Sequence, residues 1–153
     1  IKSSAASDVY KRQRLEAAGY TAKCLFISGS RVPSIPEPNP IYHLPDEEFK
    51  RELGRFEGTP KEVLENQELL DFFLPMLRAD FTMDETYYDK AGIVLHTPIA
   101  AFGGEKDGEA DESAILEWGK YTDNDFNYRI FPGGHFYLRD CEDEVISEVM
   151  RLL

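Results

Sequence analysis

Two short apolar segments constrain the fold of this chain more than any other feature. Residues 22–28 and residues 91–102 are apolar on both faces, and a glycine follows each of them. Strands of this kind must be covered by helices on both sides, which is typical of a parallel sheet in an α/β protein. A helix that ends near Gly19 precedes the first segment. The pattern therefore predicts an α/β fold in which helices flank a parallel sheet.

The second half of the chain continues the alternation of strands and helices. Asp111 or Ser113 is expected to begin a helix that Gly119 ends. A third strand and a last helix should follow, since apolar residues recur there with the spacing of each element. These residues are Phe126, Tyr128 and Ile130 in the strand, and Val145, Ile146, Val149, Leu152 and Leu153 in the helix.

Residues 44–88 interrupt this alternation with a block of predicted helices. Asp46 can cap a first helix that ends at Gly58, and Thr59 can cap a short second one. A third helix should run from about residue 66 and kink at Pro75. A helical insertion between two strands of a sheet is usually a lid over a pocket, the alternative being extra packing on the flank of the sheet.

The third helix of this block carries more apolar residues than one face can bury. They include Phe72, Phe73, Met76 and Leu77. The excess leaves two interpretations open, either the core of the insertion or a wall that binds an acyl chain.

The composition excludes several classes of protein. The net charge is −12, with 29 carboxylates against 17 Lys and Arg residues, which argues against a nucleic-acid partner. No apolar run approaches the roughly 20 residues of a membrane span, and no segment resembles a signal peptide. Cys24 and Cys141 fit neither a disulfide framework nor a zinc site, so we expect free thiols. The sequence predicts a cytoplasmic protein without a nucleic-acid or membrane partner.

The first residues of the chain show no apolar period of either kind. Residues 3–13 resemble the in-frame translation of a transposon-based sequencing adapter. We therefore expect residues 1–13 to be a non-native segment and the native sequence to begin near Arg14.

The residues best suited to catalysis follow the second and third predicted strands. Asp107 comes after the glycine pair at 103–104, and His135 comes 28 residues later, after the pair at 133–134. Glycines let the backbone turn sharply and leave the imidazole at the tip of a loop. An acid and then a histidine after successive strands is the chain order of an α/β-hydrolase triad. His135 would be the general base and acid, and Asp107 would fix its tautomer.

Other candidate residues are less convincing. Ser28 and Ser30 lack a G-x-S-x-G elbow, and prolines follow where the elbow needs a helix. His43 and His96 have neither H-E-x-x-H nor C-x-x-C spacing, so we expect no metal site.

Several motifs agree in order and spacing with one family. They are a strand at 25–33, lid segments at 43–49, 58–64 and 74–81, an acid turn at 98–107, Trp118 in the next helix, and the histidine loop at 131–136. In these segments the chain resembles the type II thioesterases, the stand-alone α/β-hydrolases of nonribosomal peptide and polyketide synthesis.

The resemblance implies that residues 14–153 are the C-terminal part of an α/β-hydrolase fold with a helical lid at about 44–88. It implies a serine thioesterase that removes aberrant acyl groups from the phosphopantetheine arm of acyl or peptidyl carrier proteins. Asp107 and His135 would be the triad acid and base, with no cofactor of the enzyme's own, and the complete protein would be a monomer. The family's G-x-S-x-G elbow is absent from this sequence, so we expect no turnover from the chain as given.

Two alternatives stay open. The acid and histidine turns alone do not determine the substrate, so the chain could belong to another α/β-hydrolase, such as an esterase or peptidase. It could also be a non-catalytic protein whose helical block binds a carrier domain. A complete upstream gene without a serine elbow would favour that second alternative.

Overall fold

The computed structural model describes residues 5–56, 58–89 and 92–153. These residues form two compact units, each with its own core. Pro36–Tyr88 forms a helical unit, and Ala5–Ile35 together with Asp89–Leu153 forms a unit that contains a sheet. None of the described helices is both long and apolar enough to span a membrane.

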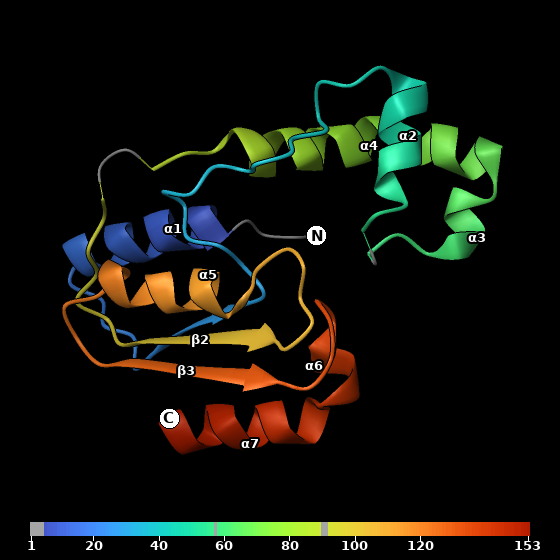
Figure 1. Cartoon of the computed structure of the whole chain (residues 1–153). Helices are drawn as coiled ribbons and strands as arrows, with labels where there is room; N and C mark the ends of the chain where they lie inside the picture. Colours follow the sequence, from blue (N-terminus) through green and yellow to red (C-terminus); the bar gives the residue numbers. More distant parts are fainter. Residues whose placement is uncertain (1–4, 57, 90–91) are drawn as a thin grey trace. The chain divides into compact units, whose positions relative to one another are not determined.

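The sheet has three parallel strands among the described residues. They are β1 (Leu25–Ser28), β2 (Ile99–Gly104) and β3 (Phe126–Phe131), in the order β1-β2-β3 (Figure 1). Leu25 pairs with Ile99, which pairs with Phe126. The predicted parallel sheet flanked by helices is therefore confirmed.

Helices cover both faces of this sheet because β2 is apolar on both. Ile99 and Ala101 belong to one buried cluster, and Ala100 and Phe102 belong to another. Figure 1 shows α1 and α5 on one side of the strands and α7 on the other. The helices of this unit are α1 (Ala5–Ala17), α5 (Glu112–Leu116), the 3-10 helix η1 (Glu117–Tyr121), α6 (Tyr137–Asp140) and α7 (Glu142–Leu152).

Helix α1 begins well before the expected native start at Arg14. Its Val9 is 1% exposed and lies in the cluster that packs on one face of the sheet. The helix ends as predicted, since Gly19 has a φ of +82° and the N–H of Tyr20 donates to the carbonyl of Leu15 at 2.9 Å. Residues 5–13 therefore have regular structure, contrary to the absence of any period in the sequence, and residues 1–4 lie outside the described residues.

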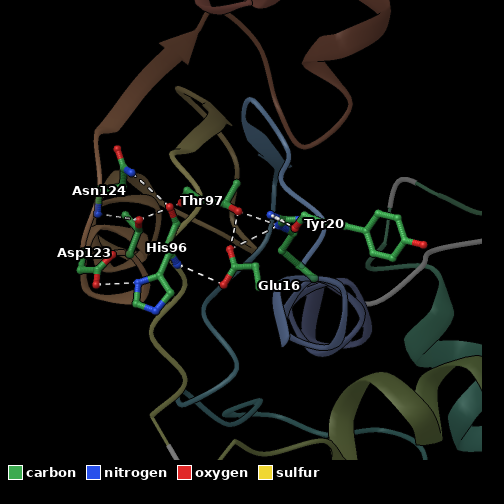
Figure 2. A network of polar contacts seen from close by, with 8 residues as sticks. Glu16, Tyr20, His96, Thr97, Asp123 and Asn124 are labelled. Carbon is green, nitrogen blue, oxygen red and sulfur yellow. Dashed lines mark hydrogen bonds and ion pairs between the residues drawn. The ribbon is translucent and has the colours of Figure 1, made fainter. Parts of the chain in front are cut away.

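A buried polar network joins α1 to the residues just before β2 (Figure 2). Arg12 Nε donates to Thr97 Oγ1 at 2.6 Å, and the Thr97 hydroxyl donates to Glu16. The same Glu16 carboxylate accepts from the N–H of His96 at 3.2 Å and faces the Arg12 guanidinium at 3.4 Å. These contacts satisfy buried charges that would otherwise be costly.

Two boundaries in this unit differ from the predictions. The second strand begins at Ile99 and not near residue 91. Pro98, just before it, has no N–H for the ladder, and Leu95 forms only an isolated bridge with Thr122. Residues 90–91, where the strand was expected to start, lie outside the described residues. Asp111 caps α5 as expected, but the chain continues beyond Leu116 as η1, so Gly119 does not end the helix.

The helical unit contains α2 (Asp46–Leu53), α3 (Lys61–Leu64) and α4 (Gln67–Thr86). Asn66 caps α4, which continues through Pro75. The first helix ends at Leu53 and not at Gly58. The core of this unit consists of Ile41, Phe49, Leu53, Leu70 and Leu74.

The two predicted caps of the shorter helices are wrong by one residue. Pro45 and Pro60 occupy the cap positions, without a side-chain capping hydrogen bond. Asp46 is the first helical residue, and its carboxylate instead accepts from Arg78 at 2.7 Å. Since Arg78 also donates to the carbonyl of Tyr42 at 2.6 Å, it fastens the start of α2 to α4.

Candidate active site

The two predicted catalytic turns lie side by side at the carboxyl ends of β2 and β3. The N–H of Lys106 donates to the carbonyl of Gly133 at 2.8 Å, which joins the turns. A Cβ on Gly104 would lie 2.2 Å from the carbonyl oxygen of Gly134, so no other residue fits there. The glycine pairs thus allow the close approach that brings the following side chains together.

Asp107 and His135 form a buried hydrogen-bonded pair. His135 Nδ1 lies 3.0 Å from Asp107 Oδ2 and 3.2 Å from Oδ1. The Asp107 side chain is fully buried, and the imidazole is 16% exposed. Asp107 Oδ1 also accepts from the N–H groups of Glu109 at 2.8 Å and Ala110 at 3.2 Å. The structure therefore brings together the two residues predicted to be catalytic.

The environment of Asp107 determines its charge and the tautomer of His135. Burial by itself would raise the pKa of Asp107, but the hydrogen bond from His135 and those from two backbone N–H groups lower it below the ordinary 3.8. An ionised carboxylate only accepts hydrogen bonds, so His135 Nδ1 must donate. In the neutral ring Nε2 is then the acceptor, which is the state that a general base needs.

The serines and histidines that sequence analysis set aside have structural partners. Ser28 Oγ lies 2.7 Å from the hydroxyl of Tyr137, and the carbonyl of Ser30 accepts from Trp118 at 2.7 Å. His96 Nδ1 lies 2.8 Å from Asp123. Within the described part of the chain, no group of three or more His, Cys, Asp or Glu residues could hold a metal ion.

The four apolar lid candidates all lie on α4, in the helical unit. Phe72 is 76% exposed and Met76 is 54% exposed, whereas Phe73 and Leu77 are partly buried. A pocket of about 220 Å³ opens beside three of them, and Phe72 does not line it. Its lining residues are Gly58, Thr59, Pro60, Val63, Phe73, Met76 and Leu77.

Sequence reasoning missed Gly29 and Tyr137 as neighbours of this pair. A Cβ on Gly29 would lie 3.3 Å from the imidazole of His135. Tyr137 is fully buried; burial, assisted by the negative charge of Asp107, raises its pKa to about 12 despite the hydrogen bond with Ser28. The glycine after the first apolar segment was the only available signal, and it indicated a turn without indicating what the turn contacts.

Comparison with known proteins identifies the family. The model of the thioesterase domain matches residues 12–153. The gramicidin S biosynthesis protein GrsT of Aneurinibacillus migulanus is 38% identical over 130 residues, which are 84% of this chain and 51% of that protein. The thioesterase PikA5 of Streptomyces venezuelae is 34% identical over 131 residues, 86% of this chain and 47% of that protein. The chain belongs to the thioesterase family.

Solved structures narrow the assignment within that family. The type II thioesterase BorB of the borrelidin biosynthetic cluster superposes with a TM-score of 0.80 at 31% identity, over 96% of this chain and 61% of BorB. The type II thioesterase YbtT of the yersiniabactin pathway gives 0.83 at 30% identity, over 92% of this chain and 57% of YbtT. These matches support a type II thioesterase, and the chain spans about half the length of the curated relatives above.

Proposed function

We propose that this chain is part of a type II thioesterase that hydrolyses aberrant acyl groups from the phosphopantetheine arm of acyl or peptidyl carrier proteins. The Asp107–His135 pair carries the proposal, because a buried carboxylate that orients an imidazole is the acid and base half of a serine triad. The names of the relatives, which refer to gramicidin S and borrelidin biosynthesis, support a substrate carried by a synthase.

In the proposed reaction His135 moves protons while Asp107 stays ionised. Nε2 of His135 takes the proton of a serine hydroxyl as the serine oxygen attacks the thioester carbonyl. It then gives this proton to the departing phosphopantetheine sulfur as the C–S bond breaks, which leaves an acyl-serine. Water attacks the acyl-serine while His135 takes its proton, and return of that proton to the serine releases the carboxylic acid.

The nucleophile is proposed to come from a part of the family fold outside this sequence. No G-x-S-x-G motif occurs in these 153 residues. Ser28 is a poor substitute, since its hydroxyl is hydrogen-bonded to Tyr137. The chain alone is therefore expected not to turn over thioesters, because removing the nucleophile from a triad removes most of its rate enhancement.

The proposed acyl-binding surface lies on helix α4. Phe72 and Met76 are exposed apolar side chains, and Phe73 and Leu77 border the pocket of about 220 Å³. Of the two exposed side chains, Met76 also lines this pocket, which favours the acyl-wall interpretation over a purely internal core.

We place this activity in the cytoplasm. Cys24 and Cys141 are both free thiols in the structure. Free cysteines without a disulfide framework are the usual state in a reducing compartment.

The test starts from the coding DNA upstream of the Arg14 codon. We expect the upstream codons, in the same reading frame, to encode a strand, a G-x-S-x-G elbow and a helix. The complete protein should then release acyl groups from acyl-phosphopantetheine carrier protein, measured as free carrier thiol, and a variant with His135→Ala should not.

Two outcomes would contradict the proposal. A complete upstream sequence without a serine elbow would favour the non-catalytic protein that binds carrier domains. A complete enzyme that hydrolyses small esters but not acyl carrier proteins would make it an esterase.

A further inference from the structure

The turn after β1 lies against the active-site pair. Gly29 has a φ of +54°, a conformation that residues with a side chain rarely adopt. Its N–H donates to the carbonyl of Phe102 at 2.9 Å, which fixes the turn to the neighbouring strand β2. This backbone contact is one of two that hold Gly29 at the end of the sheet.

The side of Gly29 on which a Cβ would stand is turned toward the Asp107–His135 hydrogen bond. A Cβ at this position would lie 3.3 Å from Cε1 and 3.4 Å from Nδ1 of His135, and 3.5 Å from Oδ2 of Asp107. Nδ1 and Oδ2 are the two atoms that this hydrogen bond joins. Contacts of 3.3 to 3.4 Å are tighter than most real Cβ contacts, so the imidazole would have to shift by a few tenths of an ångström from the place where its Nδ1 meets Asp107.

A second contact ties the end of β1 to the chain that follows His135. Ser28 Oγ lies 2.7 Å from the hydroxyl of Tyr137. The Tyr137 ring is fully buried and stacks on Phe131 with 5.3 Å between the ring centroids. Because a buried hydroxyl needs a hydrogen-bond partner, this contact keeps the turn and the histidine loop together.

We infer that Gly29 is a positioning residue for the proposed reaction: it must lack a side chain so that His135 can keep Nδ1 against Asp107, and the Ser28–Tyr137 hydrogen bond holds it in place. The pair is thus assembled by three strand ends, and not only by the two turns that carry Asp107 and His135. The catalytic relevance of this inference rests on the proposed function, but the geometry it describes does not.

The test compares two glycine substitutions in the 153-residue chain. Gly29→Ala adds a methyl group against His135, whereas Gly19→Ala adds one at a similarly positive φ of +82° with no atom within 4 Å. Both variants share the backbone strain, and only the first contacts the pair. The readout is the proton NMR signal of His135 Nδ1–H and its rate of exchange with water. The carbon-bound ring protons of His96, which is paired with Asp123 on the surface, serve as the internal reference.

In Gly29→Ala we expect the His135 Nδ1–H signal to shift and its exchange to become about tenfold faster, as for a weakened hydrogen bond to a charged group. Gly19→Ala should leave this signal as in the unchanged chain, and His96 should be unaffected in both variants. Equal exchange rates in the two variants, or an unchanged signal in Gly29→Ala, would overturn the inference.

Ser28→Ala gives a second test if Gly29→Ala does not fold. It removes the anchor to Tyr137 without adding an atom near His135, and should accelerate the same exchange about threefold. Unchanged exchange in Ser28→Ala would count against the inference in that case. Because the readout needs no turnover, it stays informative even if the complete protein does not hydrolyse acyl carrier proteins.

Discussion

Two histidine–aspartate pairs lie at opposite ends of strands β2 and β3. His96 and Asp123 precede the strands, and Asp107 and His135 follow them. The pair before the strands has the shorter contact, 2.8 Å against 3.0 Å. Its side chains are 78% and 52% exposed, whereas those of His135 and Asp107 are 16% and 0% exposed.

The difference shows that burial and additional partners, not distance, separate a candidate catalytic pair from a surface pair. Water screens an exposed ion pair, which typically contributes about 0–1 kcal/mol to stability. The side chain of Asp107 is instead fully buried and accepts from two backbone N–H groups, and its hydrogen bonds lower its pKa. Water competes less for the hydrogen bond of the buried pair, so this second arrangement holds the tautomer of its imidazole more firmly.

The largest effect should come from substituting one aspartate of each pair in the complete enzyme. Asp107→Asn presents an amide N–H to His135 and favours the wrong tautomer, so kcat should fall by about 10⁴-fold. Asp123→Asn, its matched control, should change kcat less than about twofold. Hydrolysis of acyl carrier protein measures both, and a comparable loss in the two variants would remove the distinction between the pairs.

The approach of the two catalytic turns can be tested by stability. Gly104→Ala places a Cβ against the carbonyl of Gly134 and should lower the free energy of unfolding by about 4 kcal/mol. Gly108→Ala, with no atom within 4 Å of the added Cβ, should change it by less than about 0.5 kcal/mol. Urea unfolding of both variants checks this, and equal midpoints would contradict the close approach.

The opposite end of the sheet depends on a buried charge network. In the 153-residue chain, Arg12→Met leaves the Glu16 carboxylate without its cation and should cost about 3 kcal/mol. Lys120→Met breaks a surface pair with Glu117 and should cost less than about 1 kcal/mol. If urea unfolding gave the same small change for both, α1 would not be fixed by this network.

The smallest effect should be on the pH dependence of the free energy of unfolding. The pKa of Asp107 is lower in the folded protein than the ordinary 3.8. Its contribution to the stability of the fold is therefore complete above pH 3.8 and is lost as the pH falls through the pKa of the folded state. Asp107→Asn should remove this part of the acid sensitivity, and Asp123→Asn should retain it. Unfolding curves measured between about pH 5 and pH 2 would show the difference, and parallel curves for the two variants would contradict it.

Local sequence patterns predicted most of the sheet unit. The apolar segments around Ile27 and Ala101 indicated buried parallel strands, because such strands are apolar on both faces. The glycine pairs before Asp107 and His135 indicated sharp turns at strand ends, and parallel strands place those ends at one edge. The order of the acid and the histidine then supported the two candidate catalytic residues, whose roles in catalysis stay proposals.

Only the tertiary structure decided what the patterns left open. The space beside His135 that a side chain on Gly29 would enter, and the burial of Arg12 beside Thr97, involve residues far apart in the sequence. The start of β2 at Ile99 depends on which backbone groups find a partner. Periodicity and turn residues report what each segment prefers by itself, whereas burial and hydrogen bonding depend on what packs against it. The sequence alone therefore indicated the family and the acid–histidine pair, and the fold determined how that pair is held.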